Sequence, residues 1–411
     1  MASPATDLRG RLESLAGLGQ VLPTLGELPW PIYLVGGAVR DLLRGAESVD
    51  LDIAVEGDAA AAARQLAERL GGSAIEHERF GTATMHAGSL TLDLAATRRE
   101  IYDRPGALPR VEPAPLHEDL GRRDFTVNAM AVALAGEDLG VLHDPHDGQG
   151  DLGAGWIRVL HPASFLDDPT RLLRALRYEA RLGFALHAET ERLAREAAAG
   201  GALGTVSGDR IRVELEQLLA EPEAPLAVSR LAELGLDRSL HPALEADAQL
   251  VASAQLGAAE TGASPVLSAL AALGVGGAGE GLGGWVAGLG LGAAGREAVL
   301  AAMRGAPSLV RELSADMRPS ALHARLSGQP PEALALALAL GAPAEPILRY
   351  LAALRHVRLE ITGADLVAAG VPESPGLGRA LKETLRRKLD GELSGREEEL
   401  EAALALAREP S

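Results

Sequence analysis

Several residue types and patterns are absent or rare in this sequence, and each absence excludes a class of protein. There is no cysteine, which excludes disulfide bonds and thiolate metal sites. Aromatic residues make up only 3% of the 411 residues, so stacking on aromatic rings cannot be the main way of binding nucleic acid. No apolar run reaches the length of a membrane span, and the first residues lack the pattern of a leader peptide. We therefore expect a cytoplasmic protein with no membrane segment, long enough for two or more domains.

Basic residues are also scarce. The chain has 39 Lys and Arg against 57 Asp and Glu, a formal net charge of -18. As an average this argues against nucleic acid as a partner, because phosphate binding depends on cationic side chains that release counterions. The arginines are nevertheless clustered along the chain, at Arg98, Arg99, Arg104, Arg110, Arg122, Arg123, Arg171, Arg174, Arg177 and Arg181. This clustering leaves room for a local basic groove on an acidic protein, and a solvated charged surface remains a good explanation for any single arginine.

A glycine turn between two regular elements is the first informative motif. The apolar residues 32–35 predict a strand that ends at Gly36 and Gly37, and residues 38–44 predict the helix that follows. Backbone N–H groups at such a helix start favour phosphate. No Lys-Ser or Lys-Thr follows the glycines, so the turn is not a P-loop, nor does it form a dinucleotide fingerprint. It predicts a place for a nucleoside triphosphate.

A carboxylate pair follows the turn. Residues 49–55 alternate as in a strand, which places Asp50 and Asp52 on one face and turns Leu51 and Ile53 to the core. Two carboxylates on one face suit a hard divalent cation. A solvated strand face is the alternative for an isolated pair of this kind.

The order of expected elements divides the chain into two halves. Residues 1 to about 150 predict an α/β arrangement, with strands near 32–35, 49–55, 74–76, 82–86 and 90–95 and helices near 38–44 and 58–70. Beyond Pro162 the strand signals fade. Apolar residues recur there at helical spacing, first over residues 166–182, 188–199 and 209–220. We expect the second half to be all-helical.

Further motifs follow in a fixed order over roughly the first 220 residues. After the glycine turn and Asp-x-Asp come Arg122-Arg123-Asp124-Phe125-Thr126, Asp144-Pro145 with Gly148 and Asp151-Leu152, Asp168-Pro169-Thr170-Arg171, and residues 209–215. The first two resemble the nucleotidyltransferase superfamily of DNA polymerase beta. The whole series resembles one family within it, the bacterial tRNA nucleotidyltransferases of the second class and the related poly(A) polymerases.

The resemblance implies an architecture and an activity. The architecture is a polymerase-beta-type nucleotidyltransferase head over residues 1–150, a helical neck with a nucleotide-selecting template over 151–225, a helical body over 226–330 and a helical tail in contact with tRNA over 331–411. The activity is template-independent addition of C, A or both to the tRNA 3′ end from CTP and ATP, with two Mg²⁺ ions. No protein partner is indicated.

The same resemblance implies which residues act. Asp50 and Asp52 are the expected catalytic and metal-binding residues. The expected nucleotide-binding residues are Gly37, Arg40, Arg123, Asp124, Asn128, Asp168, Arg171, Arg174 and Arg177. Among these, Gly37, Arg40 and Arg123 are expected at the triphosphate, Asp124 near the ribose, and Asn128 as a support of the local turn.

Asp168 and Arg171 are the expected base-selecting pair. Three residues apart on a helix, they share a face and present an acceptor beside a donor fork. Cytosine and adenine both offer an amino group to a carboxylate and a ring nitrogen to an arginine, whereas uracil and guanine place an oxygen where the carboxylate expects a donor. A surface ion pair is the alternative. Asp167 departs from the family, which usually carries Glu there.

Several alternatives remain open. Residues 97–120 resemble the flexible loop used for switching from CTP to ATP, but the segment does not decide among full CCA, CC-only and A-only addition. A poly(A) polymerase on the same scaffold and a non-catalytic RNA-binding protein are the rival functions; a small-molecule nucleotidyltransferase would not need the long helical half. Asp93 is either a third metal carboxylate or a surface residue.

Three further motifs in the sequence are weaker. His143-Asp144 matches a metal phosphohydrolase pair but lies inside a family motif. Residues 274–279 satisfy G-x-G-x-x-G without the expected strand and acidic residue, so a loop between helices is the better interpretation. In the C-terminal half, residues 361–381 faintly resemble a segment that contacts the tRNA arm. The cations Lys382, Arg386, Arg387 and Lys388 face either phosphate or solvent.

Overall fold

The structure is a computed structural model that describes residues 8–15, 17–46, 51–77, 81–275 and 281–408. The chain divides into two compact units, Met1–Leu240 and His241–Ser411. Asp50, one of the two expected metal carboxylates, lies outside the described residues.

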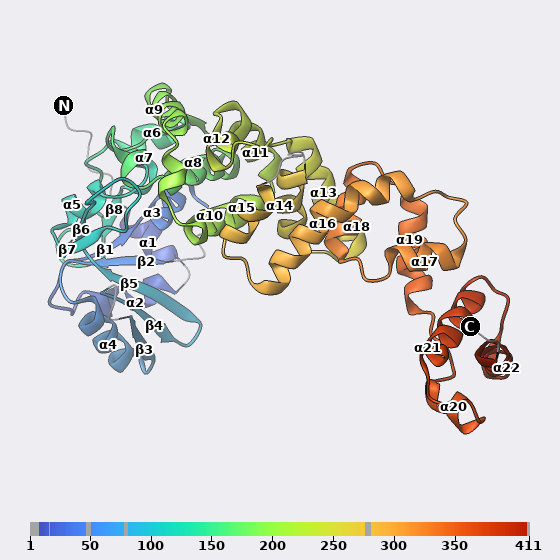
Figure 1. The fold of residues 1–411 in the computed structure, drawn as a ribbon. Coiled ribbons are helices and arrows are strands. Elements are labelled where there is room, and N and C mark those ends of the chain that lie inside the picture. The colour runs from blue at the N-terminus through green and yellow to red at the C-terminus, as the bar shows by residue number, and fades with distance from the viewer. Residues whose placement is uncertain (1–7, 16, 47–50, 78–80, 276–280, 409–411) are drawn as a thin grey trace. The chain divides into compact units, whose positions relative to one another are not determined.

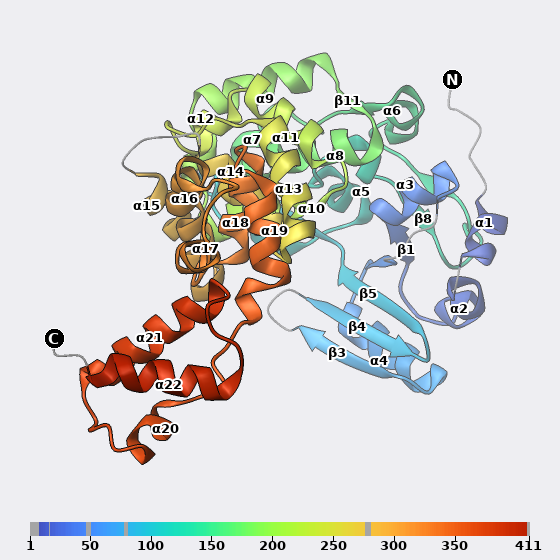
Figure 2. The same ribbon diagram turned by 90° about the vertical axis from the view of Figure 1, so that its right-hand side faces the viewer.

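A mixed sheet forms the centre of the first unit (Figures 1 and 2). Its strand order is β3-β4-β5-β2-β1-β8-β9, and β2 and β5 are parallel while the other neighbours are antiparallel. The strands are β1 (Ile32–Val35), β2 (Asp52–Val55), β3 (Ser73–His77), β4 (Thr82–Ala87), β5 (Leu90–Ala96), β8 (Ala131–Ala133) and β9 (Leu142–His143). The strands expected from the alternating pattern are therefore confirmed among the described residues.

Both faces of the central strands are covered. Leu34, Leu51 and Ile53 belong to the larger core, which packs against the helices on one face, as the alternation predicts. Val35 and Ala54 pack on the other face. Asp52 precedes Ala54 by two residues and so projects from this second face, at the edge of the core, where it is exposed.

The helices of the head are short. They are α1 (Arg9–Ser14), α2 (Leu18–Leu25), α3 (Gly37–Arg44), α4 (Ala59–Leu70) and α5 (Leu116–Gly121), with the 3₁₀ turn η2 (Thr126–Asn128). The Asp58 side chain accepts a hydrogen bond from the Ala61 N–H, 2.9 Å, and so caps α4. Helix α4 lies against β3, β4 and β5 (Figure 2), and α5 contributes Leu116 and Leu120 to the opposite face.

Residues 97–120 are more regular than expected. They form the antiparallel hairpin β6 (Arg98–Ile101) and β7 (Arg110–Pro113), followed by α5. The low periodicity of the sequence hid this hairpin because both of its faces are largely polar and partly exposed.

A helical layer follows the head. Its elements are α6 (Gly148–Ala154), β10 (Trp156–Ile157), α7 (Ser164–Asp167), α8 (Thr170–Leu182), β11 (Ala185–Leu186), α9 (Ala188–Ala199), η3 (Ala202–Thr205), α10 (Gly208–Ala220), α11 (Ala224–Glu233) and α12 (Leu236–Leu240). The short parallel pair β10 and β11 is an exception to the expected all-helical half.

The single helix expected over residues 166–182 is wrong in one respect. Asp168 has φ -131° and ψ 93°, so it separates α7 from α8. The cause is Pro169, because the ring of a proline disfavours helical backbone in the residue before it. Asp168 and Arg171 therefore do not lie on one helix, and their spacing is not fixed by helical geometry.

The second unit is helical throughout its described residues. It contains α13 (Ala248–Thr261), α14 (Pro265–Val275), α15 (Leu282–Gly288), α16 (Ala293–Glu312), α17 (Pro319–Leu326), α18 (Pro331–Ala339), α19 (Ala344–Ala352), η4 (Leu354–His356), α20 (Gly363–Ala368), α21 (Pro375–Leu389) and α22 (Gly395–Arg408). The G-x-G-x-x-G segment begins at the end of α14, and its remainder, with the loop expected there, lies outside the described residues.

No helix in the described part of the chain is both long and apolar enough to span a bilayer.

Close packing of α13 on α18 generates a stability prediction. A Cβ added at Gly257 would lie 2.8 Å from the Ala335 carbonyl oxygen, so Gly257→Ala forces the helices apart. Overpacking should cost roughly 1–3 kcal/mol, more than the gain of about 1 kcal/mol in helix propensity. Urea unfolding should therefore show a lower midpoint. In the matched control, Gly284→Ala in α15, the added methyl meets open space, and equal or higher stability is expected. A stabilised Gly257→Ala would contradict the packing argument.

Candidate active site

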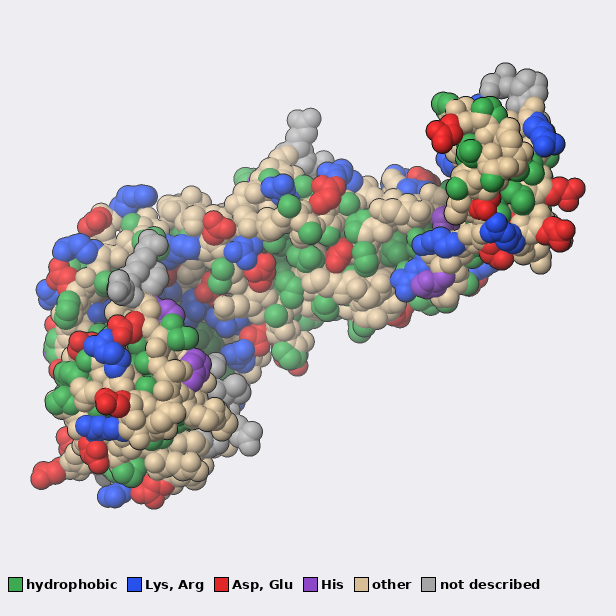
Figure 3. Space-filling model, turned by 90° about the horizontal axis from the view of Figure 1, so that it is seen from below, with side chains coloured by type: hydrophobic (Ala, Val, Ile, Leu, Met, Phe, Trp, Pro, Cys, Tyr) green, Lys and Arg blue, Asp and Glu red, His purple; other side chains and the backbone are tan. Residues whose placement is uncertain are grey.

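A polar cavity of about 320 Å³ opens at the carboxyl end of β1. Figure 3 shows Lys and Arg side chains in a hollow of the first unit, in line with the clustering of arginines along the sequence. The cavity is lined by Gly36, Gly37, Asp52, Glu100, Tyr102, Arg122, Arg123, Asp124, Asn128, Asp168, Arg171, Arg174 and Tyr178. Eight of the eleven expected site residues are among them.

The other three expected residues do not line this cavity. Arg40 and Arg177 are buried side chains behind the lining, each hydrogen-bonded to residues that do line it or support it. Asp50 lies outside the described residues. The nucleotide-binding roles of Arg40 and Arg177 therefore remain predictions. In the structure their side chains support neighbouring residues of the site, Asn128 and Glu214.

The glycine turn brings backbone and guanidinium close together. Gly36 has φ +71°, a conformation that favours glycine, and it immediately precedes the first residue of α3, Gly37. A Cβ on Gly36 would lie 3.0 Å from Nη1 of Arg123 and 3.8 Å from Oδ2 of Asp52. The turn is thus compact because no side chain intervenes between the helix start, the arginine and the carboxylate.

Asp52 borders a second cavity of about 380 Å³, which also shares Arg122 and Arg123 with the first. Asp93 lines this second cavity and is the register partner of Asp52 on the neighbouring parallel strand. Its Oδ1 accepts a hydrogen bond from the Thr84 hydroxyl, 2.7 Å. Within the described residues no group of three or more His, Asp or Glu side chains is arranged to hold a metal ion.

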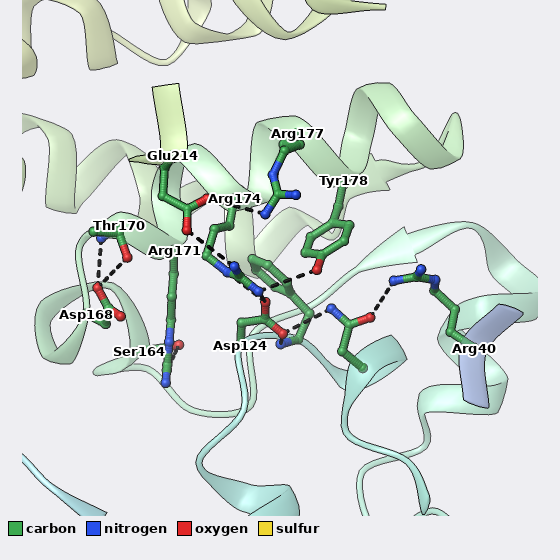
Figure 4. Close-up of polar contacts among 12 residues, drawn as sticks. Arg40, Asp124, Ser164, Asp168, Thr170, Arg171, Arg174, Arg177, Tyr178 and Glu214 are labelled. Carbon is green, nitrogen blue, oxygen red and sulfur yellow. Dashed lines mark hydrogen bonds and ion pairs between the residues drawn. The ribbon is translucent and has the colours of Figure 1, made fainter. Parts of the chain in front are cut away.

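The buried Asp124 carboxylate is the hub of the site (Figure 4). Its Oδ1 accepts hydrogen bonds from the Phe125 N–H, 2.8 Å, and from the Asn128 amide, 3.0 Å. Its Oδ2 accepts two from Arg174, at 2.6 and 3.0 Å. Burial raises the pKa of Asp124, but the charge of Arg174 and the hydrogen bonds outweigh it, and the net pKa lies below the ordinary value.

The polar network extends from this hub in two directions. Arg40 donates to the Asn128 amide oxygen, 2.7 Å, and pairs with its neighbour Asp41, 2.9 Å. On the other side Glu214 of α10 accepts from both Arg174 and Arg177, each at 3.3 Å. The network therefore links α3, η2, α8 and α10.

Three of these guanidinium groups surround one aromatic ring. Arg40, Arg174 and Arg177 lie 5.5, 5.7 and 5.3 Å from the centre of the Tyr178 ring. Cations at such distances are attracted to the face of an aromatic ring. Tyr178 therefore adds an attractive contact for these three cations beside the carboxylates Asp41, Asp124 and Glu214 that pair with them.

A second buried carboxylate, Asp119 on α5, holds the adjacent arginines. It accepts from Arg122 at 2.8 Å and from Arg123 at 3.0 Å. Burial raises the pKa of Asp119, and the two guanidinium charges outweigh it and bring the pKa below the ordinary value. Arg123 is thereby oriented beside the glycine turn.

The two expected base-reading side chains both line the first cavity and are held by different partners. The Arg171 guanidinium donates to the Ser164 hydroxyl, 2.7 Å, and to the Arg122 carbonyl oxygen, 2.6 Å. Oδ1 of Asp168 accepts from the Thr170 hydroxyl, 2.6 Å, and from an arginine of α10. Since an arginine carries five N–H donors, three on Arg171 remain for other partners.

Five lining residues were not among those expected: Gly36, Glu100, Tyr102, Arg122 and Tyr178. Gly36 and Arg122 stand inside the quoted motifs, and Tyr178 follows Arg174 by four residues, so helical spacing could have identified it. Glu100 and Tyr102 come from the β6–β7 hairpin and carried no local signal.

The cations of α21 for which the sequence left both phosphate and solvent open are mostly paired. Arg386 binds Glu383 and Asp390, and Lys388 binds Glu360 and the buried Glu399. These contacts fit a solvated or structural helix face on α21, and the phosphate-facing role stays a prediction.

The sheet, the glycine turn and the carboxylate beside it define a nucleotidyltransferase head of the DNA polymerase beta type. Residues 32–158 match the family model described as the Poly A polymerase head domain. Residues 183–247 match the model described as the probable RNA and SrmB-binding site of polymerase A.

Relatives extend this match along the chain. An A-adding tRNA nucleotidyltransferase of Geobacter sulfurreducens is 38% identical over 93% of this chain and 46% of its own, and a CC-adding tRNA nucleotidyltransferase of Deinococcus radiodurans is 34% identical over 91% of this chain and 89% of its own. The structure of the Thermotoga maritima CCA-adding enzyme complexed with tRNA-CCA superposes with a TM-score of 0.79 at 30% identity, over 98% of this chain and 99% of that one. The chain belongs to the family of tRNA nucleotidyltransferases and related poly(A) polymerases. It spans about half the length of the Geobacter relative.

The Asp124 hub generates a pH-dependent prediction. Because the folded-state pKa of Asp124 is lowered, its carboxylate stabilises the fold above the ordinary pKa of about 4, and this stabilisation is lost as pH falls through the folded-state value. Asp124→Asn should lower the free energy of unfolding by about 2 kcal/mol near neutral pH, the size of a charged buried hydrogen bond. The measurement is urea unfolding of both proteins at neutral pH and near pH 3, where the difference should shrink.

The matched control is Asp103→Asn, an exposed residue between β6 and β7. It should leave the unfolding midpoint unchanged at both pH values. A difference between the wild type and Asp124→Asn that stays constant with pH would overturn the assignment of a lowered pKa.

Proposed function

We propose that this protein is a template-independent tRNA nucleotidyltransferase that adds C, A or both to the tRNA 3′ end, with CTP and ATP as donors. The observation that carries the proposal is that residues from four separate motifs line one cavity, with Asp52 shared between that cavity and a second one. Two adjoining spaces with a carboxylate between them suit a reaction between two substrates. Membership of the family and the similarity to A-adding, CC-adding and CCA-adding enzymes support it.

The first cavity is the proposed triphosphate site. Arg123 lies beside the glycine turn and Arg174 at the Asp124 hub, so cationic donors and the N-terminus of α3 converge on the same space. Both features favour phosphate oxygens. Because Asp119 and Asp124 already orient these arginines, little conformational entropy is lost when a triphosphate binds.

The residues at the strand end fit magnesium. Asp52 is exposed at the start of β2 and borders both cavities, and carboxylate oxygen is the donor that a hard cation prefers. We propose that Asp52 and Asp50 hold Mg²⁺. The ion would neutralise charge on the triphosphate and make the 3′-hydroxyl of tRNA a better nucleophile. Asp93, its carboxylate engaged by Thr84, is a supporting candidate only.

Asp168 and Arg171 are the proposed base readers. One carboxylate and one guanidinium at the same cavity can accept from the amino group and donate to the ring nitrogen that cytosine and adenine share. Uracil and guanine would leave a carboxylate oxygen facing another acceptor, and an unmatched polar group of this kind gives strong discrimination. Selection would thus come from protein side chains and need no nucleic-acid template.

The helical regions and the compartment complete the proposal. The residues beyond about 150 form a neck, a body and a tail, and the tail contacts the tRNA substrate. The cytoplasm, which holds tRNA and both nucleotides, is the proposed compartment.

Incubation with labelled nucleotides tests the function. The substrates are tRNA transcripts that lack the whole CCA end or only its final A, each with CTP or ATP supplied separately. A CC-adding enzyme stops after two additions of C, an A-adding enzyme extends only the second transcript, and a CCA-adding enzyme does both. Long tails from ATP alone would establish a poly(A) polymerase instead, and no incorporation into any transcript would refute the proposal.

Substitution of Asp52, the proposed metal ligand that the structure describes, tests the mechanism. Asp52→Asn keeps the side-chain shape but loses the charge, and it should lower kcat by about a hundredfold or more, since metal stabilisation of the transition state is worth several kcal/mol. The control is Glu68→Gln, an exposed residue of α4, which should retain wild-type kcat. Single-turnover incorporation into tRNA is the measurement, and an unchanged rate in Asp52→Asn would end the catalytic assignment.

A further inference from the structure

Arg210 lies beside the proposed base readers and has no part in the function proposed above. It stands in the first turn of α10, and its Nη2 donates to Oδ1 of Asp168, 2.7 Å, while its Nη1 donates to the Gly106 carbonyl oxygen, 3.0 Å. A cation in the first turn of a helix opposes the helix dipole. The position is therefore unfavourable for α10 itself, and these two contacts offset the cost.

The contacts distinguish the two oxygens of Asp168. Oδ1 accepts three hydrogen bonds, from Arg210, from the Thr170 hydroxyl at 2.6 Å and from the Thr170 N–H at 3.0 Å. No hydrogen bond to Oδ2 occurs among the described residues. One oxygen is thus fully occupied in fixing the carboxylate, and the other is left to accept from a ligand in the cavity that Asp168 lines.

Asp168 needs such support because its backbone does not provide it. The residue lies between α7 and α8 in an extended conformation, and apart from Arg210 only Thr170, the first residue of α8, bonds to its side chain. Without Arg210, the carboxylate would keep only the local contacts to Thr170, which follow any rotation of the α7–α8 connection.

The second contact anchors Arg210 to the β6–β7 connection. Gly106 is buried with φ +71°, and its N–H donates to the Leu166 carbonyl oxygen, 3.1 Å. A Cβ on Gly106 would lie 2.2 Å from Oγ1 of Thr205, so only glycine fits between α7 and η3. The guanidinium therefore spans a firmly seated backbone carbonyl and the Asp168 carboxylate.

We propose that Arg210 is a positioning residue for base selection: it fixes the Asp168 carboxylate so that Oδ2 alone meets the amino group of the incoming base. The inference rests on the proposed function, in which Asp168 reads that group. Arg210 is not among the residues that line the first cavity, and it acts through Asp168.

Comparison of base discrimination in variants tests this role. For each protein, kcat/KM is measured for CTP and ATP against UTP and GTP on the tRNA transcripts, together with equilibrium binding of all four nucleotides in Mg²⁺. Arg210→Met should reduce the preference over UTP and GTP by about tenfold to a hundredfold, because a loosened acceptor no longer penalises the wrong base. Arg210→Lys, which can reach only one of the two acceptors, should restore part of the preference.

Two controls separate positioning from stability. Arg192→Met removes an exposed, ion-paired arginine of α9 and should keep wild-type discrimination. Thermal unfolding shows whether the Arg210 variants are folded. If Arg210→Met does not fold, discrimination is compared between the wild type and Arg210→Lys. An equal loss of all four nucleotides in a folded Arg210 variant would indicate a structural role and overturn the inference.

Asp168→Asn distinguishes the two levels of the proposal. If it changes discrimination while both Arg210 variants keep it, the positioning role is wrong and the base-reading function stands. If Asp168→Asn leaves discrimination unchanged, base reading by Asp168 is itself wrong, and the role of Arg210 falls with it.

Discussion

The burial of the Asp124 carboxylate is the constraint on which the first unit depends. A charge removed from water is tolerated only when its oxygens are paired, and here backbone, amide and guanidinium donors supply four hydrogen bonds. Two of the donor residues also bind elsewhere: Asn128 accepts from Arg40 of α3, and Arg174 of α8 pairs with Glu214 of α10. Satisfying one carboxylate therefore ties α3, the η2 turn and α8 to one another.

The same pairing explains how an acidic protein can hold so many arginines in one place. Asp119 and Asp124 pair with arginines that line the cavity, Glu214 pairs with Arg177 behind it, and the Tyr178 ring contacts three of the guanidinium groups. A cavity built in this way presents oriented N–H donors, and the formal charge of the whole chain says little about it. Buried carboxylates fix direction here, whereas exposed ones would be displaced by water.

The alternating strands were predictable from the sequence because burial imposes a period of two, and Leu51 and Ile53 lie in the core as that period requires. The motifs likewise gave most of the cavity lining. Two kinds of feature could not be predicted. The β6–β7 hairpin has no buried face to create a pattern, and the layering of Arg40 and Arg177 behind Tyr178 depends on tertiary contacts between distant elements. Pro169 by itself indicates a break in the helix, but the helical periodicity of the residues around it favours one continuous helix.

That break frees the spacing of the proposed base-reading pair, Asp168 and Arg171, from helical geometry. On one helix, two side chains three residues apart keep a nearly constant separation. Here the acceptor belongs to the connection between α7 and α8 and the donor to α8 itself, so their separation is set by tertiary contacts, those of Asp168 with Arg210 and of Arg171 with Ser164. A pyrimidine and a purine place their pairing edges at different depths from the sugar. Because these contacts hold the proposed pair in place, the position of the bound nucleotide has to take up the difference in ring size between cytosine and adenine.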